Sequence, residues 1–254
     1  MQNYMIERLV ERISLSPFKK NFIIKGGFLV SAMVGLQSRT TMDLDSTVKG
    51  FALTDEKLFD VFTQICAFKA DDDVSFEIGV ISEIRKGNDC PGCRVSLKAN
   101  YPPISVPLAV DVTTGDAITP GEVETAFPLL FDRRAINAFT YNVETLLAEK
   151  LDTTLFRGIA NTRMRDYYDI HCLRVRSGVR IDDETLRRAL KRTAENRGHA
   201  DVLTDYLEIV KEIWVSEELR KLWRAYALKY DYVRNLSFDE VCNSIRILAQ
   251  VACS

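Results

Sequence analysis

Two aspartates, Asp43 and Asp45, stand one residue apart in the segment RTTMDLDST (residues 39–47), which has the pattern of a β-strand. On an extended backbone, residues i and i+2 point to the same side, so the two carboxylates would lie beside each other. Like charges at that spacing repel unless a cation lies between them. The spacing therefore raises the hypothesis of a metal site.

Two further features, a Gly-Gly pair before the aspartates and a single aspartate after them, follow the order expected for a metal site that binds a phosphate. Gly26 and Gly27 fall between the apolar strand FIIK and a helical pattern, where backbone N–H groups can approach an anion closely. Asp111 follows the apolar run PLAV of a later strand. Carboxylates without a neighbouring His or Cys favour Mg²⁺ or Mn²⁺, and two such ions can activate a hydroxyl and stabilise leaving pyrophosphate. Each feature alone is common in turns and strands, but their order indicates a nucleotidyltransferase.

The elements that would position these residues change in type along the chain. Strands are predicted over residues 22–25, 43–47, 74–84, 94–99 and 104–112, with helices over 1–20, 28–36 and 54–68. The second half is helical, over residues 142–156, 163–174, 183–193, 202–213, 217–230 and 238–252, with Asn142 as a cap and a capping box at Ser237–Glu240. We expect an α/β (α+β) fold: an α/β domain over residues 1–135 and a helical domain over 136–254 that completes the active-site cleft.

Composition narrows the class of protein. Hydrophobic residues make up 46% of the 254 residues and charged residues 28%, with a net charge of −2, which is typical of a globular protein without a uniformly basic surface. No run of eighteen apolar residues and no signal-peptide core is present, so we expect a cytoplasmic protein that makes no membrane contact. Of six cysteines, only Cys90 and Cys93 are closely spaced. A Pro-Gly turn explains them better than zinc or redox chemistry, whose other parts are missing.

The helical half carries a run of cations that an RNA acceptor would need, although such a run is equally typical of a solvated helix face. Its members are Arg157, Arg163, Arg165, Arg174, Arg176, Arg180, Arg187, Arg188, Lys191, Arg192 and Arg197. His171 and His199 form no ligand cluster. Trp214 and Trp223 are expected in the core.

Four stretches resemble the abortive-infection type E toxin (AbiEii/AbiGii-like) nucleotidyltransferases, within the DNA polymerase β-like nucleotidyltransferase superfamily. They are KGGFLVSAMVGLQSRTTMDLD, VDVTTGDAITP, ETLLAEKLDTTLFRG and RMRDYYDIHCL, which span about residues 20 to 175. The resemblance implies a polymerase-β-like mixed sheet followed by a helical bundle. It also implies a bacterial type IV toxin that transfers a nucleotide from an NTP to RNA such as the tRNA 3′ end, with a cognate antitoxin.

The resemblance also implies roles for single residues. Asp43, Asp45 and Asp111 would hold the metal, and Lys150 and Asp166 would join Asp43 and Asp45 as catalytic residues. The nucleotide would be bound by Gly26, Gly27, Arg39, Thr41, Glu149, Arg165 and Asp169. Arg165 stands where the family usually has Lys, and its planar guanidinium could change that role.

Lys150 has a second interpretation that needs no nucleotide. It lies near the buried side of its helix, and Asp166 and Asp169 share a face of another helix. An inter-helix salt bridge between them would satisfy the lysine equally well. At the level of the whole protein, two alternatives stay open: a nucleotidyltransferase acting on a protein or a small molecule, and a catalytically silent NTP-binding module.

Overall fold

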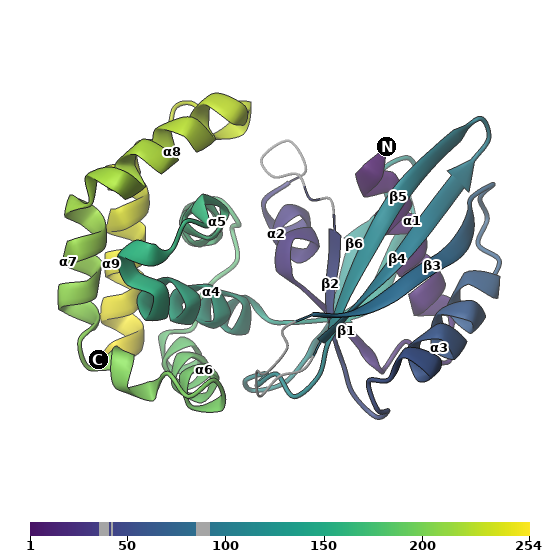
Figure 1. Cartoon of the computed structure of the whole chain (residues 1–254), viewed down its shortest axis with the longest axis horizontal. Coiled ribbons are helices and arrows are strands. Elements are labelled where there is room, and N and C mark those ends of the chain that lie inside the picture. Colours follow the sequence, from purple (N-terminus) through teal and green to yellow (C-terminus); the bar gives the residue numbers. More distant parts are fainter. Residues whose placement is uncertain (36–40, 42, 85–91) are drawn as a thin grey trace. The chain divides into compact units, whose positions relative to one another are not determined.

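The computed structural model describes residues 1–35, 41, 43–84 and 92–254, and the chain forms two compact units (Figure 1). The sheet unit comprises Met1–Ala32, Thr40–Asp116 and Glu122–Tyr141. The helical unit comprises Met33–Arg39, Ala117–Gly121 and Asn142–Ser254. The division into domains 1–135 and 136–254 stays a prediction. The units differ from it, because residues 136–141 belong to the sheet unit and residues 33–39 and 117–121 to the helical unit.

Within the described residues, the sheet unit is built on a seven-stranded mixed sheet with the order β3-β4-β5-β2-β1-β7-β6. Its strands are β1 (Phe22–Lys25), β2 (Asp43–Val48), β3 (Ser75–Ile84), β4 (Gly92–Tyr101), β5 (Ile104–Thr113), β6 (Val123–Pro128) and β7 (Ala135–Thr140). Its helices are α1 (Gln2–Leu15), α2 (Gly26–Val34), whose last two residues belong to the helical unit, and α3 (Asp55–Ala67). β1 pairs in parallel with β7, and β2 pairs in parallel with β5, while the other neighbours are antiparallel. The predicted mixed α/β fold is confirmed.

Alternation along β2 and β5 gives this part of the sheet one apolar face and one polar face. Leu44 of β2 is buried, as are Val110 and Val112 of β5, and Leu44 and Val110 are register partners. Asp43 and Asp45 alternate with Leu44 and so point to the opposite face. Helix α1 packs against β5 and β7, and α3 packs against β3. Asp43 and Asp45 can therefore stay partly accessible to solvent while the apolar face of the same strands packs in the core.

β6 and β7 lie where no strand is predicted. β7 pairs through Ile23–Phe139 and Ile24–Thr140 with β1, which is far away in the sequence. The sequences of these strands, VETAFP and AINAFT, contain alanine, asparagine and proline, which are weak strand formers. β7 is therefore stabilised by its partners in the sheet more than by its own composition.

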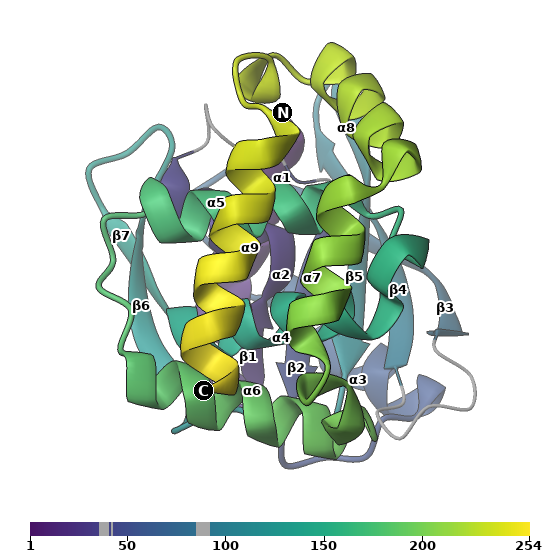
Figure 2. The same ribbon diagram turned by 90° about the vertical axis from the view of Figure 1, so that its left-hand side faces the viewer.

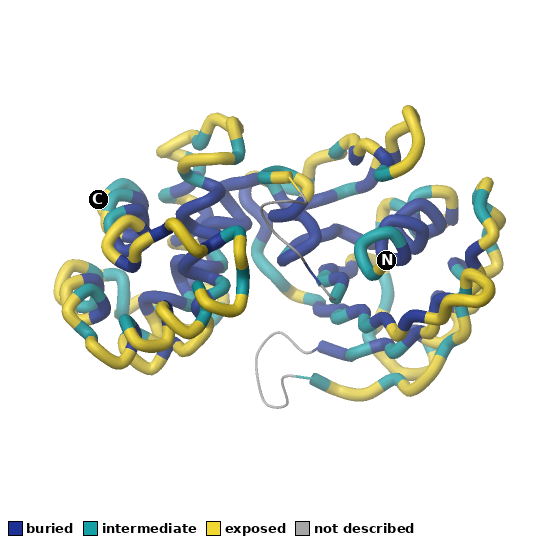
Figure 3. Tube along the Cα trace, turned by 90° about the horizontal axis from the view of Figure 1, so that it is seen from above, coloured by how far each residue is buried: buried dark blue, intermediate teal, exposed yellow. Residues whose placement is uncertain are grey.

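β3 and β4 form the predicted antiparallel hairpin, in which Ile84 pairs with Gly92. Gly92 and Cys93 already belong to β4, so these two residues are strand rather than turn, while Cys90 and Pro91 lie outside the described residues. Cys93 is buried, and burial raises the pKa of its thiol, which disfavours redox chemistry. β3 is an edge strand with a register shift between Ile78 and Ile81, and its trace is yellow and teal throughout (Figure 3).

A buried ion pair joins the end of β1 to the segment that follows β5. Lys25 Nζ is 2.8 Å from Asp116 Oδ2, and the two side chains are 4% and 2% exposed. The hydroxyls of Thr47 and Thr113 donate to the same carboxylate oxygen. Burial of Asp116 raises its pKa, but the charge of Lys25 and the hydrogen bonds outweigh burial and lower the pKa to about 2. The network connects β1, β2 and β5 directly next to Gly26.

Replacing Asp116 by asparagine is expected to lower the free energy of unfolding at neutral pH by about 3 kcal/mol, because one partner of a buried pair is removed. Because the pKa is depressed by folding, the carboxylate stabilises the wild type fully above about pH 4, where the unfolded group ionises. This contribution is lost as the pH falls toward about 2. Urea titrations should therefore show the difference between wild type and Asp116→Asn shrinking across this window. A difference that is independent of pH would contradict an ionised Asp116.

The helical unit contains the remaining helices of the described residues. They are α4 (Val143–Arg157), α5 (Met164–Val175), α6 (Asp183–Asn196), α7 (Tyr206–Val215), α8 (Glu217–Lys229) and α9 (Phe238–Cys253), with short 3₁₀ turns at Gly158–Ala160, Ala200–Leu203 and Asp231–Val233. The Asn142 side chain accepts a hydrogen bond from the Thr145 amide (2.7 Å), and Ser237 and Glu240 form the predicted capping box. α4 packs on α5 and α6, and α9 packs on α5, α6 and α7 (Figure 2).

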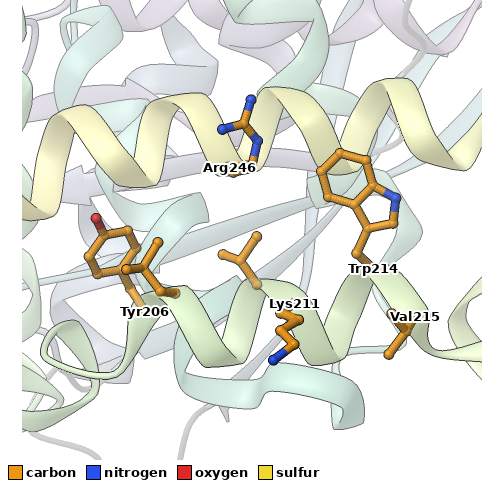
Figure 4. Close-up of a pocket in the computed structure, with 7 residues that line it drawn as sticks. Tyr206, Lys211, Trp214, Val215 and Arg246 are labelled. Carbon is orange, nitrogen blue, oxygen red and sulfur yellow. The ribbon is translucent and has the colours of Figure 1, made fainter.

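The two tryptophans of this unit have different environments. Trp223 is 2% exposed, which confirms its predicted place in the core. Trp214 is only half-buried and lines a groove of about 260 Å³ together with Tyr206, Lys211 and Arg246, so its predicted place in the core is wrong (Figure 4). The indole N–H donates to Asp239 (2.8 Å). This polar partner lets the ring stay at the surface.

Candidate active site

The two aspartates of the opening motif lie on β2, as predicted. Asp45 pairs with Lys25 of β1 on one side and with Asp111 of β5 on the other, and Asp43 pairs with Ala109. Cross-strand partners project to the same face, so Asp43, Asp45 and Asp111 share one face of the sheet. The sheet therefore places the three carboxylates proposed as metal ligands on one face.

Gly26 and Gly27 begin α2 directly after β1. The amide of Gly27 donates to Asp45 Oδ2 at 3.3 Å. Gly26 has a φ of +65°, and a Cβ at this position would stand 2.0 Å from the same carboxylate oxygen. Only glycine combines this backbone conformation with so close an approach to Asp45. The start of the helix thus fixes the position of the carboxylate.

Asp111 has a partner that the sequence did not suggest. Arg94 of β4 donates from Nε to Oδ1 (2.7 Å) and from Nη2 to Oδ2 (2.8 Å). These hydrogen bonds raise the pKa of Arg94, and the charges of Asp43 and Asp45 act in the same direction. Arg94 lies outside the recognised motifs, and only the β4–β5 register could have indicated it.

The residues fit a metal only in part. Asp43 and Asp45 offer hard oxygen ligands on one face, as a divalent cation requires. Both oxygens of Asp111, however, already accept hydrogen bonds from Arg94. In the part of the chain that the structure describes, no three His, Cys, Asp or Glu side chains form a group that could hold a metal ion. The role of Asp43, Asp45 and Asp111 as a set of three metal ligands therefore stays a prediction.

Lys150 lies in the helical unit and has the partners named in its second interpretation. Its Nζ is 2.7 Å from Asp169 Oδ2 and 3.1 Å from Asp166 Oδ1, and all three side chains are at most 11% exposed. Arg163 Nε lies 2.9 Å from the other oxygen of Asp166. A buried lysine must be paired, and these carboxylates supply the pairing within the protein itself. The arrangement fits a structural salt bridge within the helical unit.

Of the other predicted nucleotide contacts, Glu149 and Thr41 have partners of their own within the protein. Glu149 accepts a hydrogen bond from Arg197 (2.7 Å), which also contacts Asp152 (3.1 Å). The Thr41 hydroxyl is buried and donates to the carbonyl of Asp43 (3.0 Å), while Arg165 is half-buried on α5. Arg39 lies outside the described residues. Thr41 therefore supports β2 through the backbone, and Glu149 has a structural partner that the sequence did not reveal.

A comparison with protein families decides the identity of the chain. The model of the nucleotidyl transferase AbiEii toxin of type IV toxin–antitoxin systems matches residues 8–244. The chain belongs to the AbiEii family. This AbiEii-family chain is accordingly a nucleotidyltransferase and a toxin of a type IV system, and the family implies an NTP substrate and an antitoxin.

Solved structures agree with this AbiEii fold. JHP933 from Helicobacter pylori is 15% identical with a TM-score of 0.51, covering 99% of this chain and 90% of its own. A candidate nucleotidyltransferase from H. pylori is 14% identical with a TM-score of 0.51, covering 98% of this chain and 92% of its own. The search of curated proteins finds no match. None of the helices in the described part of the AbiEii-family chain is long and apolar enough to cross a bilayer.

Proposed function

We propose that this chain transfers a nucleotide from an NTP to a hydroxyl of an RNA such as the tRNA 3′ end, with a divalent cation held by Asp43 and Asp45. The placement of both carboxylates on one face of β2, with Asp45 fixed by the start of α2, carries the proposal. A bound Mg²⁺ or Mn²⁺ would neutralise phosphate charge there. In the reaction, the acceptor oxygen bonds to the α-phosphorus, the bond to the β-phosphate breaks, and pyrophosphate leaves.

The RNA acceptor is supported by charge on the helical unit. Seven of the predicted cations are exposed: Arg157, Arg163, Arg176, Arg180, Arg188, Lys191 and Arg192. Arg197 is not available, because it pairs with Glu149 and Asp152. Of the seven, Arg163 also pairs with the buried Asp166, and the other six can contact phosphates without breaking such a pair. Transfer to a protein or a small molecule would not need this set of cations.

Transfer of label from each α-labelled NTP tests the proposal. Wild type and Asp45→Ala are incubated with total bacterial RNA and soluble protein, with Mg²⁺ or with a chelator. We expect label on small RNA that disappears in the variant and with the chelator. Label on protein would replace the RNA acceptor by the protein alternative. Binding of NTP without transfer to RNA or protein would contradict the proposed activity and indicate a silent module.

In the proposed reaction, Lys150 exchanges its contacts with Asp166 and Asp169 for a contact with a phosphate of the NTP. Lys150→Met is therefore expected to reduce kcat/KM for the NTP at least about a hundredfold. The substitution also breaks a buried ion pair and should lower the free energy of unfolding by about 3–5 kcal/mol. Leu151→Ala on the same helix is a matched control, because Leu151 is fully buried and its truncation costs about 2–5 kcal/mol. Equal losses of activity in both variants at a temperature where both are folded would assign Lys150 a structural role alone.

A further inference from the structure

The pairing of Arg94 with Asp111 has consequences for the number of metal ligands. The planar guanidinium contacts both carboxylate oxygens, at 2.7 and 2.8 Å. Such a bidentate pair is stronger and more specific in geometry than a single contact. The Asp111 side chain is 19% exposed and that of Arg94 43% exposed, so solvent reaches the pair from the side of Arg94. An ion that used Asp111 would have to approach a fixed positive charge.

The strand register places the guanidinium of Arg94 in line with the carboxylates of Asp111 and Asp45. Arg94 pairs with Asp111 across β4 and β5, and Asp111 pairs with Asp45 across β5 and β2. Neighbouring strands lie about 4.8 Å apart, so the three side chains form one row on the same face of the sheet. The row runs from Arg94 through the two carboxylates to Lys25, the register partner of Asp45 on β1, and Asp43 lies two residues along β2. Arg94 stays ionised at any working pH.

The pair is not needed to join its strands. β4 and β5 are in register from Gly92–Thr113 to Tyr101–Ile104, along the whole of both strands. Solvent screens a partly exposed salt bridge, so the pair adds little to the pairing of these two strands. The position of Arg94 opposite a candidate metal ligand therefore calls for a reason other than strand pairing.

We propose that Arg94 holds Asp111 out of the metal site, so that the divalent cation is bound through Asp43 and Asp45 without Asp111. Arg94 is then a positioning residue. It supplies a permanent cation in the row of carboxylates and limits the number of ions that the site accepts. This inference rests on the proposed metal-dependent function and changes its ligand set.

Binding of Mn²⁺ to the full chain without nucleotide tests the proposal, with free Mn²⁺ followed by electron paramagnetic resonance. Wild type is compared with Asp111→Asn, Asp45→Asn, Arg94→Gln and the double variant Arg94→Gln/Asp111→Asn. Asp111→Asn should leave the affinity within about threefold of wild type, the size of an exposed charge effect. Asp45→Asn should weaken binding about tenfold or more. Arg94→Gln should bind Mn²⁺ more tightly or bind a further ion, and the double variant should lose this gain.

Two results would overturn the proposal. The first is a loss of Mn²⁺ affinity in Asp111→Asn equal to that in Asp45→Asn, and the second is unchanged Mn²⁺ binding in Arg94→Gln that is folded. If Arg94→Gln does not fold, the comparison of Asp111→Asn with Asp45→Asn decides alone, because Asp111→Asn leaves only an accessible arginine without its partner.

Nucleotide transfer by the same preparations separates this inference from the proposed function. A wild type that transfers label while Asp111→Asn has lost Mn²⁺ affinity would overturn the role of Arg94 and leave the function standing. A wild type that neither binds Mn²⁺ nor transfers label would overturn both.

Discussion

Asp45→Asn is expected to reduce nucleotide transfer at least about a thousand-fold while leaving the fold intact. Asn has nearly the same shape as Asp but no negative charge. The bound divalent cation would therefore lose a carboxylate ligand, and the Gly27 amide would lose the ionised oxygen to which it donates. Asp45 is only half-buried on the polar face, so a large loss of stability is not expected. Initial rates of label transfer at saturating NTP, together with thermal unfolding of both proteins, measure the effect.

Asp60→Asn is the matched control for this experiment. Asp60 is an exposed aspartate on α3, where it accepts a hydrogen bond from Gln64, and it lies outside the candidate site. The Asp60→Asn variant should transfer nucleotide at the wild-type rate. A folded Asp45→Asn with more than about a tenth of wild-type activity would rule out Asp45 as a residue of the reaction.

Gly26→Ala is expected to lower nucleotide transfer about a hundredfold, although the substitution adds a single methyl group. That group would stand 2.0 Å from Asp45 Oδ2, so the carboxylate has to move from its place beside the start of α2. The positive φ of Gly26 adds a backbone cost of about 1–2 kcal/mol for alanine. The rate of transfer and the free energy of unfolding are both measured.

The control variant Gly178→Ala separates the backbone cost of a positive φ from the displacement of the Asp45 carboxylate. Gly178 has a φ of +67°, close to that of Gly26, but no atom lies within 4 Å of its added Cβ. Both variants should lose stability through the backbone, whereas only Gly26→Ala should lose activity. If both variants keep wild-type transfer rates, the position of Asp45 does not depend on this glycine.

The sequence predicts best what depends on neighbouring residues. The Asn142 cap and the Ser237–Glu240 capping box are local patterns, and both are found as predicted. The alternation around Asp43 and Asp45 likewise predicts a strand with both carboxylates on one face, which β2 confirms. Such features are decided by a few adjacent side chains and backbone groups.

The features that escaped prediction depend on distant partners. β7 is a strand because β1 and β6 flank it, and Arg94 meets Asp111 because β4 and β5 pair in one particular register. Trp214 has the helical spacing of a core residue, yet Asp239 gives its indole a polar partner at the surface. No local pattern contains this information, because each partner is decided by tertiary packing.

The irregular strand β3 bears on how the protein behaves at high concentration. It is an edge of the sheet, and Gly79 and Val80 lie at the shift in its pairing with β4. A free edge can recruit a strand of another molecule, and Val80, which is 71% exposed, would favour such growth. An irregularity at this point interrupts the straight row of hydrogen-bonding groups that an added strand needs. We therefore expect the irregularity of β3 to hinder the addition of a strand from another molecule to this edge.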